Sequence, residues 1–143
     1  MLSFSTIHQR RIAFWGFVLN ALWEFVQCPL FYDMSDMSFW AGSLLMWGAI
    51  IGDVVIVLAI VRLSAFVSED LFQDDRSIWM FLIFFSLVAA VLLEWAAMVL
   101  DLWQYKEGMP TLYLLGQTVG LVPVLQISIL PALSLYLASQ HCP

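Results

Sequence analysis

The sequence has little charge and very few basic residues. Only 11% of its 143 residues are charged, whereas 63% are hydrophobic. Soluble domains carry about 25% charged and about 45–50% apolar residues, so a soluble fold of this length could not hide so much apolar surface. With 5 basic against 11 acidic side chains the net charge is −6. This balance excludes nucleic acid as a partner and gives no attraction to anionic lipid headgroups.

Cysteine and histidine are also scarce, and neither has the spacing of a reactive or metal-binding site. Cys28 and Cys142 are far apart and match no metal or redox motif. His8 and His141 lie near the two ends of the chain. The Glu-x-x-His repeat of di-iron helix bundles is missing as well. We therefore predict no bound metal and no cofactor.

Long apolar runs are the feature that the sequence has in abundance. Four runs are long enough to cross a hydrocarbon core, which takes about 20 residues. Short polar connections join them, so neighbouring helices should be antiparallel. We predict an all-α fold, an up-down integral membrane bundle of four transmembrane helices that forms one domain over residues 1–143. The predicted helices cover about residues 11–31, 40–63, 78–103 and 112–138.

The basic residues predict how this bundle is oriented. Arg10, Arg11, Arg62 and Arg76 fall on one side of the membrane, and only Lys106 falls on the other. The positive-inside rule then puts both termini in the cytoplasm.

The connection between the second and third predicted helices also holds apolar residues. Leu71 and Phe72 interrupt its run of charged side chains. We expect part of this connection to form a short helix lying on the membrane surface.

Three carboxylates lie inside the predicted spans: Glu24, Asp53 and Glu94, each on a different helix. A charge at the centre of a span costs about 2.5–3.5 kcal/mol on insertion scales, and no basic residue lies at the same depth to neutralise them. We therefore expect at least some of them to be protonated, or to face a cation. That cation would be a metal ion, a substrate ammonium group or a transient carbocation.

Other polar and aromatic side chains share helix faces with these carboxylates. On the first helix, Asn20, Glu24 and Gln27 have i, i+4, i+7 spacing, so they should point together into the bundle. We expect one polar pocket in the outer half, with Asp53 and Gln126 nearer the midplane. Buried carboxylates also serve as hydrogen-bonding contacts between helices, but that role does not require ionisable groups. The candidate ligand-binding residues are Asn20, Gln27, Trp23, Trp95, Asp101, Gln117 and Gln126.

Small residues form two GxxxG motifs within the predicted helices. Gly48 and Gly52 form one, and Gly116 and Gly120 form the other. In membrane helices this spacing favours close packing. The packing would be within the chain, in a homodimer or against the subunits of a larger membrane complex.

The order of these motifs resembles a family of small bacterial four-helix membrane proteins of unknown function. The resemblance covers Asn20 to Pro131 and implies a place in the bacterial inner membrane, without supplying an activity. It rests on Asn20-x-x-Trp23-Glu24-x-x-Gln27-x-Pro29-Leu30, Gly52-Asp53, Glu94-Trp95, Met109-Pro110 and Gly120-Leu121-x-Pro123-x-Leu125-Gln126.

A second part of the chain is similar to membrane cyclases and isomerases. Glu94-Trp95, Trp103-x-Tyr105 and Pro110 follow in the order of the third helix and next turn of lycopene cyclase domains, with a weaker likeness to sterol-isomerase-like bundles. The similarity implies intramembrane carboxylates that protonate a double bond and hold a carbocation. The Pro-x-Glu-Glu type motif of those enzymes is absent from this chain.

Two kinds of function fit these features. The first is an isomerase or cyclase that protonates an apolar lipid or isoprenoid, with Glu94 or Glu24 as the general acid and Asp53 among the groups that stabilise positive charge. The second is a non-catalytic subunit or binding module of a larger membrane complex, or else a small dimeric transporter. The sequence leaves open whether the chain is an enzyme.

Overall fold

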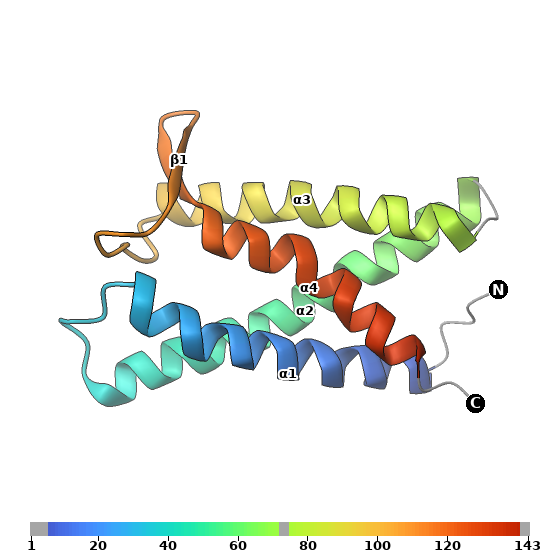
Figure 1. Ribbon diagram of the computed structural model, residues 1–143, viewed down its shortest axis with the longest axis horizontal. Coiled ribbons are helices and arrows are strands. Elements are labelled where there is room, and N and C mark those ends of the chain that lie inside the picture. The colour runs from blue at the N-terminus through green and yellow to red at the C-terminus, as the bar shows by residue number, and fades with distance from the viewer. Residues whose placement is uncertain (1–5, 72–74, 141–143) are drawn as a thin grey trace.

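The computed structural model describes residues 6–71 and 75–140, which form four helices and one β-hairpin (Figure 1). Successive helices run in opposite directions. The start of α1 and the end of α4 therefore lie at one end of the bundle, called here the terminal end, and the hairpin lies at the other, the hairpin end (Figure 1). The prediction of a mostly helical chain with four helices is confirmed. The elements are α1 (Thr6–Phe31), α2 (Phe39–Leu71), α3 (Asp75–Val99), β1 (Thr111–Leu114), β2 (Gln117–Gly120) and α4 (Leu121–Ser139).

Within the described residues, three helices are long and apolar enough to cross a membrane. These are Phe39–Glu69, Arg76–Val99 and Leu121–Ser139, and they indicate a membrane protein. The first helix, α1, is not among them, because Asn20, Glu24 and Gln27 lower its mean hydropathy.

The second helix, α2, is longer than predicted. It continues past residue 63 to Leu71 as one helix, so no separate surface helix begins before that residue; Phe72 lies outside the described residues. The serines in this stretch are compatible with a helix when their hydroxyls find a backbone partner. The buried Ser64 hydroxyl does so by donating to the Ile60 carbonyl at 2.7 Å.

The third helix, α3, ends four residues earlier than predicted. Asp101 has a left-handed backbone with φ 51°, and the Leu102 amide donates to the Ala97 carbonyl at 3.0 Å. This is the Schellman pattern, which closes the last turn of a helix. Residues 100–103 therefore lie outside the helix that was predicted to contain them.

The predicted fourth helix is wrong in its first part, because residues 111–120 form an antiparallel hairpin. Its strands pair from Thr111 opposite Gly120 to Leu114 opposite Gln117. The two residues between the strands, Leu115 and Gly116, have φ 47° and φ 86°. Two positive φ values are what a type I′ hairpin turn requires, and glycine adopts the second without strain.

The hairpin contains one of the two predicted GxxxG motifs. Gly116 is in the turn and Gly120 ends β2, so these two glycines do not form a helical GxxxG face. The helix α4 begins only at Leu121, with Pro123 in its first turn. Proline is tolerated there because the backbone amides of the first turn have no acceptor within the helix, so a residue without an amide proton loses no hydrogen bond.

The apolar core lies in the terminal half of the bundle, where all four helices contribute to one cluster. The cluster combines the first turns of α1, the second half of α2, the first half of α3 and the end of α4. Its buried members are Ile12, Val57, Ile60, Val61, Ala65, Ile78, Leu82, Leu135 and Ala138.

The helix α2 crosses the bundle obliquely (Figure 1). Near the hairpin end it lies against α1, where Trp47 stacks on Phe17 and meets Phe25 edge to face. Near the terminal end it reaches α3, where the Ser68 and Ser77 hydroxyls are hydrogen-bonded. The first half of α2 and the second half of α3 therefore diverge towards the hairpin end.

The hairpin end is closed by the segment that follows α3. The Asp33 amide donates to the Gln104 carbonyl at 2.9 Å, and the Lys106 amide donates to the Phe31 carbonyl at 2.8 Å. Tyr32 forms an isolated bridge with Tyr105, and their rings are in contact. These bonds attach the end of α1 to the chain beyond α3.

Candidate functional site

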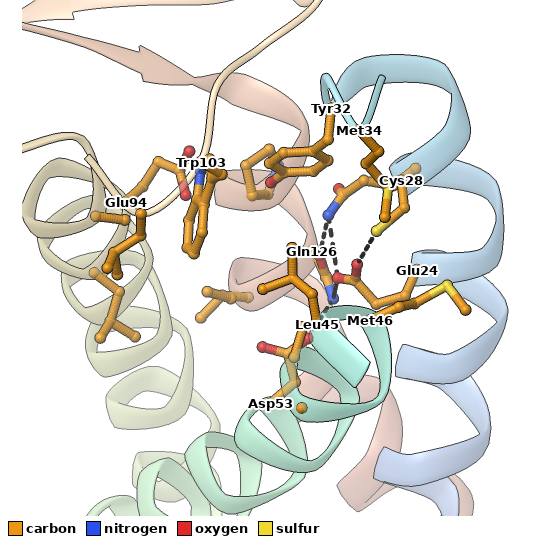
Figure 2. Close-up of a pocket in the computed structure, with 18 of the residues that line it drawn as sticks. Glu24, Cys28, Tyr32, Met34, Leu45, Met46, Asp53, Glu94, Trp103 and Gln126 are labelled. Carbon is orange, nitrogen blue, oxygen red and sulfur yellow. Dashed lines mark hydrogen bonds between the residues drawn. The ribbon is translucent and has the colours of Figure 1, made fainter. Parts of the chain in front are cut away.

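A cavity of about 560 Å³ lies between the helices in the hairpin half of the bundle (Figure 2). This size is within the range of about 300–1,000 Å³ that is usual for small-molecule pockets. Its walls are mainly apolar, with Leu44 and Leu45 from α2 and Leu93 and Leu100 from the end of α3 and the turn after it. These four leucines are also exposed on the surface, so the cavity opens between α2 and α3.

Three carboxylates from three helices line this cavity: Glu24 of α1, Asp53 of α2 and Glu94 of α3. Figure 2 shows Glu94 on one side, and Glu24 with Gln126 on the other. Glu24 and Glu94 are both buried. The structure therefore places the three predicted acidic residues around one space.

Gln126 of α4 is the centre of the hydrogen-bond network on the Glu24 side. Its amide nitrogen donates to Asn20 Oδ1 at 3.0 Å, Glu24 Oε1 at 2.9 Å and Asp53 Oδ2 at 2.7 Å. Its oxygen accepts from Gln27 Nε2 at 3.1 Å. An amide nitrogen has two hydrogens, so at least one of these three donations is shared. Gln126 thus connects α4 to both α1 and α2 through polar atoms.

Both oxygens of Glu24 accept hydrogen bonds. Oε1 accepts from Gln27 Nε2 at 3.1 Å as well as from Gln126, and Oε2 accepts from Cys28 Sγ at 3.0 Å. The Trp23 indole donates to Gln27 Oε1 at 2.8 Å and so helps to hold the Gln27 side chain in place. An ionised carboxyl group is an acceptor at both oxygens, whereas a protonated one must donate from one of them. Both oxygens of Glu24 are therefore surrounded by hydrogen-bond donors.

Glu94 has the opposite environment. Only 2% of its surface is exposed, and its Oε1 has no hydrogen-bond partner among the described residues; the buried Trp103 Nε1 also lacks one there. Figure 2 shows Trp103 beside Glu94. The Trp103 indole and the Gly120 backbone interact with the Glu94 carboxyl group, although neither is hydrogen-bonded to Oε1. Glu94 is therefore buried with fewer donors than Glu24, and burial with few donors disfavours a negative charge.

Gly120 brings the hairpin close to Glu94. A Cβ atom at this position would lie 2.8 Å from Tyr105 Oη and 3.2 Å from Glu94 Oε1. The Gly120 amide instead donates to Tyr105 Oη at 3.1 Å. Glycine is therefore needed here for the close approach of three segments of the chain.

The charged residue types that line the cavity are all acidic. Among the described residues that line it, none is basic. The nearby Lys106 ammonium donates to the Pro29 carbonyl at 3.0 Å instead. At the rim, the Ser35 hydroxyl and amide donate to Asp33 Oδ1 and, with a smaller contribution from Lys106, hold the pKa of that carboxyl below its usual value.

Five of the seven predicted ligand-binding residues do not line the cavity where the structure describes it: Asn20, Trp23, Trp95, Asp101 and Gln117. Trp95 is one residue after Glu94, about 100° around the helix, and its indole donates to the Leu115 carbonyl at 3.5 Å. Asp101 is exposed beyond the end of α3, and Gln117 pairs with Leu114 in the hairpin. Trp23 donates a hydrogen bond to Gln27 and does not itself line the cavity.

Asn20 lies within the network and outside the lining. It is buried, accepts from Gln126 and donates to the Gly16 carbonyl at 2.8 Å. Gln27 and Gln126 both line the cavity. Of the seven predicted ligand-binding residues, these three form the network around Glu24.

Sequence reasoning missed several lining residues. It compares Cys28 only with metal and redox spacings, which Cys28 does not match, although the i+4 position relative to Glu24 gives this cysteine the same helix face. Tyr32 and Trp103 lie outside helices, so no periodic pattern could place them. It assigns Gly48 to packing, yet a Cβ there would meet nothing within 4 Å, and the same is true of Gly52. Gly48 instead lines the cavity.

No group of three or more His, Cys, Asp or Glu side chains in residues 6–71 and 75–140 is arranged to hold a metal ion. No family model, curated protein or solved structure matches the chain. The two resemblances seen in the sequence therefore stay predictions.

Proposed function

We propose that this chain is a membrane enzyme that binds an apolar lipid or isoprenoid in the hairpin-half cavity and moves a double bond by proton transfer. The observation that carries the proposal is the contrast between two carboxyl groups of one apolar cavity. Glu94 has a buried oxygen with no donor among the described residues, whereas Glu24 accepts with both of its oxygens. Environments that favour different protonation states in neighbouring carboxyl groups are typical of acid–base sites.

In this mechanism Glu94 is the general acid. It gives its proton to a carbon–carbon double bond of the bound chain and leaves a carbocation. The negative charge of Glu24, beside Asp53, stabilises that cation from the other side of the cavity. The Glu94 carboxylate then removes a proton from a neighbouring carbon, which restores its protonated form. Substrate and product are isomers, so no oxidant, reductant or second substrate is consumed.

We also infer that α1 is a fourth membrane span, with both termini in the cytoplasm of a bacterium and the protein in its inner membrane. The polar residues of α1 face the network, while its exposed residues include Phe14, Leu22, Phe25 and Val26, which suits contact with lipid. The arginines belong to segments near the terminal end. Reporter fusions at each terminus test this orientation; activity of a periplasmic reporter at either one would contradict it.

Isotope exchange tests the proposed chemistry and does not require an identified substrate. Membranes that contain the protein are incubated in D₂O, and the apolar lipid fraction is analysed by mass spectrometry. A lipid that undergoes protonation and deprotonation at carbon gains deuterium. We expect Glu94→Gln to lower this uptake by about 100-fold or more, because an amide cannot act as the acid.

The matched control is Glu107→Gln, which makes the same chemical change at an exposed turn residue outside the cavity and should leave uptake unchanged. Absence of any lipid labelled by the unaltered protein would contradict the proposal. Equal labelling by the protein and by Glu94→Gln would contradict the role of Glu94.

A further inference from the structure

We propose that the ligand is a long apolar chain with a neutral or cationic head, and that it enters sideways from the bilayer between α2 and α3, passing over Gly48. This inference rests on the proposed function, because it concerns the ligand of the same cavity. It excludes fatty acids and prenyl diphosphates, which also have long apolar chains.

The acidic residues of the lining support the first part of this proposal, a neutral or cationic head. Glu24, Asp53 and Glu94 border the cavity, Asp33 lies at its rim, and no described lining residue is basic. An anionic head would lie close to carboxyl groups, and no basic side chain would neutralise it. Like charges at close range cost several kcal/mol. A hydroxyl or ammonium head can instead donate a hydrogen bond to a carboxyl oxygen of Glu24 or Asp53, which leaves Glu94 for the double bond.

The shape of the cavity fits an extended chain. On α2 its lining runs from Leu44 to Ile56, which corresponds to about 18 Å at the rise of 1.5 Å per residue. Apart from Gly48 and Asp53, the lining residues along this length are leucine, methionine, alanine and isoleucine. A chain lying parallel to the helices would therefore bury its apolar length against α2 and α3.

The route of entry follows from which sides are closed. At the hairpin end, the backbone bonds from Asp33 to Gln104 and from Lys106 to Phe31 join the end of α1 to the segment after α3. At the terminal end, the apolar core fills the bundle. Between α2 and α3 the helices diverge, and the cavity reaches the lipid-facing surface.

Gly48 lies on this open side. It is exposed, lines the cavity, and a Cβ added to it would meet nothing within 4 Å. The absence of a side chain leaves room where α2 borders the opening, so Gly48 acts as a size-determining residue of the portal. Gly48 thereby has a role that does not depend on helix packing.

Binding in lipid nanodiscs tests the head-group chemistry. A diazirine-labelled oleyl alcohol is crosslinked to the full chain by light, and oleyl alcohol, oleylamine and oleate compete for the site. These competitors share one chain and differ in head charge. We expect the alcohol and the amine to compete, and oleate to compete at least about tenfold less well. Competition by oleate equal to that of the alcohol would overturn the proposal.

The portal has its own test in the same assay. Gly48→Leu should lower crosslinking about tenfold, because the added side chain fills the opening. The matched control is Ala59→Leu, which adds bulk to an exposed position of α2 outside the cavity and should leave crosslinking unchanged. Equal crosslinking by Gly48→Leu and the control would overturn the entry route.

The outcomes separate this inference from the proposed function. Selective binding of the neutral and cationic probes, without deuterium uptake into any lipid, supports the ligand class and contradicts the proton transfer. Deuterium uptake together with preferred binding of oleate contradicts the ligand class and leaves the proton transfer supported. If none of the three competitors displaces the probe, the ligand class is overturned.

Discussion

The two halves of the bundle are built from the same four helices but differ in how they are filled. In the terminal half, side chains such as Ile12, Val61, Leu82 and Leu135 meet in one apolar cluster. In the hairpin half, the same helices enclose a cavity with carboxylates and amides on its walls. The oblique path of α2 accounts for much of this difference, since it lies near α3 at one end and away from it at the other.

The comparison shows how a small membrane protein can hold polar groups without losing its fold. A cavity forfeits van der Waals contacts, and buried carboxyl groups are costly in lipid. Here the closely packed half is separate from the half that holds these features. We therefore expect substitutions in the terminal half to affect stability most, and substitutions in the cavity wall to affect the ligand.

The largest expected effect is the loss of a side chain from the terminal core. Leu82 is 0% exposed, whereas the cavity-wall Leu93 is 41% exposed. Leu82→Ala should lower the free energy of unfolding by about 2 kcal/mol. This is the low end of the range for buried leucines, because lipid is as apolar as leucine and mainly packing is lost.

Leu93→Ala is the matched substitution in the other half, and we expect a change below about 0.5 kcal/mol. Unfolding by sodium dodecyl sulfate in mixed micelles, followed by tryptophan fluorescence, measures both variants. An equal loss in the two variants would show that the halves do not differ in packing.

The next effect concerns the polar network. Gln126→Leu keeps a side chain of similar size but removes the donor that Asn20, Glu24 and Asp53 share. Leaving these acceptors without it should cost about 1–2 kcal/mol in the same assay. Gln117→Leu, in the hairpin and outside the network, is the control and should change stability little. A neutral result for Gln126→Leu would mean that the network is not structural.

Much of the network followed from helical spacing. Asn20, Glu24 and Gln27 share a face because the helix repeats every 3.6 residues, and the structure places all three beside Gln126. Asp53 and Glu94 were found because ionisable groups are rare in apolar runs. Periodicity and transfer cost act locally, so they can be read from one sequence.

The remaining features depend on contacts that local patterns do not contain. Residues 111–120 lead directly into the apolar run of α4, but the positive φ values at Leu115 and Gly116 allow a tight hairpin turn. The position of Trp95 next to Glu94 suggests a place in the pocket, whereas its side chain reaches the hairpin at Leu115. Trp103 enters the cavity only because α3 ends early and the chain turns back.

The smallest effects distinguish two glycines that the sequence places in equivalent motifs. Gly120→Ala puts a Cβ atom 2.8 Å from Tyr105 Oη and 3.2 Å from Glu94 Oε1, so either the hairpin or the Glu94 side chain must shift. We expect a loss of about 1 kcal/mol in the free energy of unfolding, as for other overpacked sites. Gly48→Ala adds a Cβ atom that meets nothing within 4 Å.

For Gly48→Ala we expect a gain in stability of about 0.5–1 kcal/mol, because alanine restricts the unfolded chain and favours the helix. The two variants make the same chemical change, so their opposite signs would report the local space alone. Micelle unfolding of both, side by side, measures the difference. A loss of stability in Gly48→Ala would mean that this face of α2 is covered in the membrane, and the open side of the cavity would then have to be placed elsewhere.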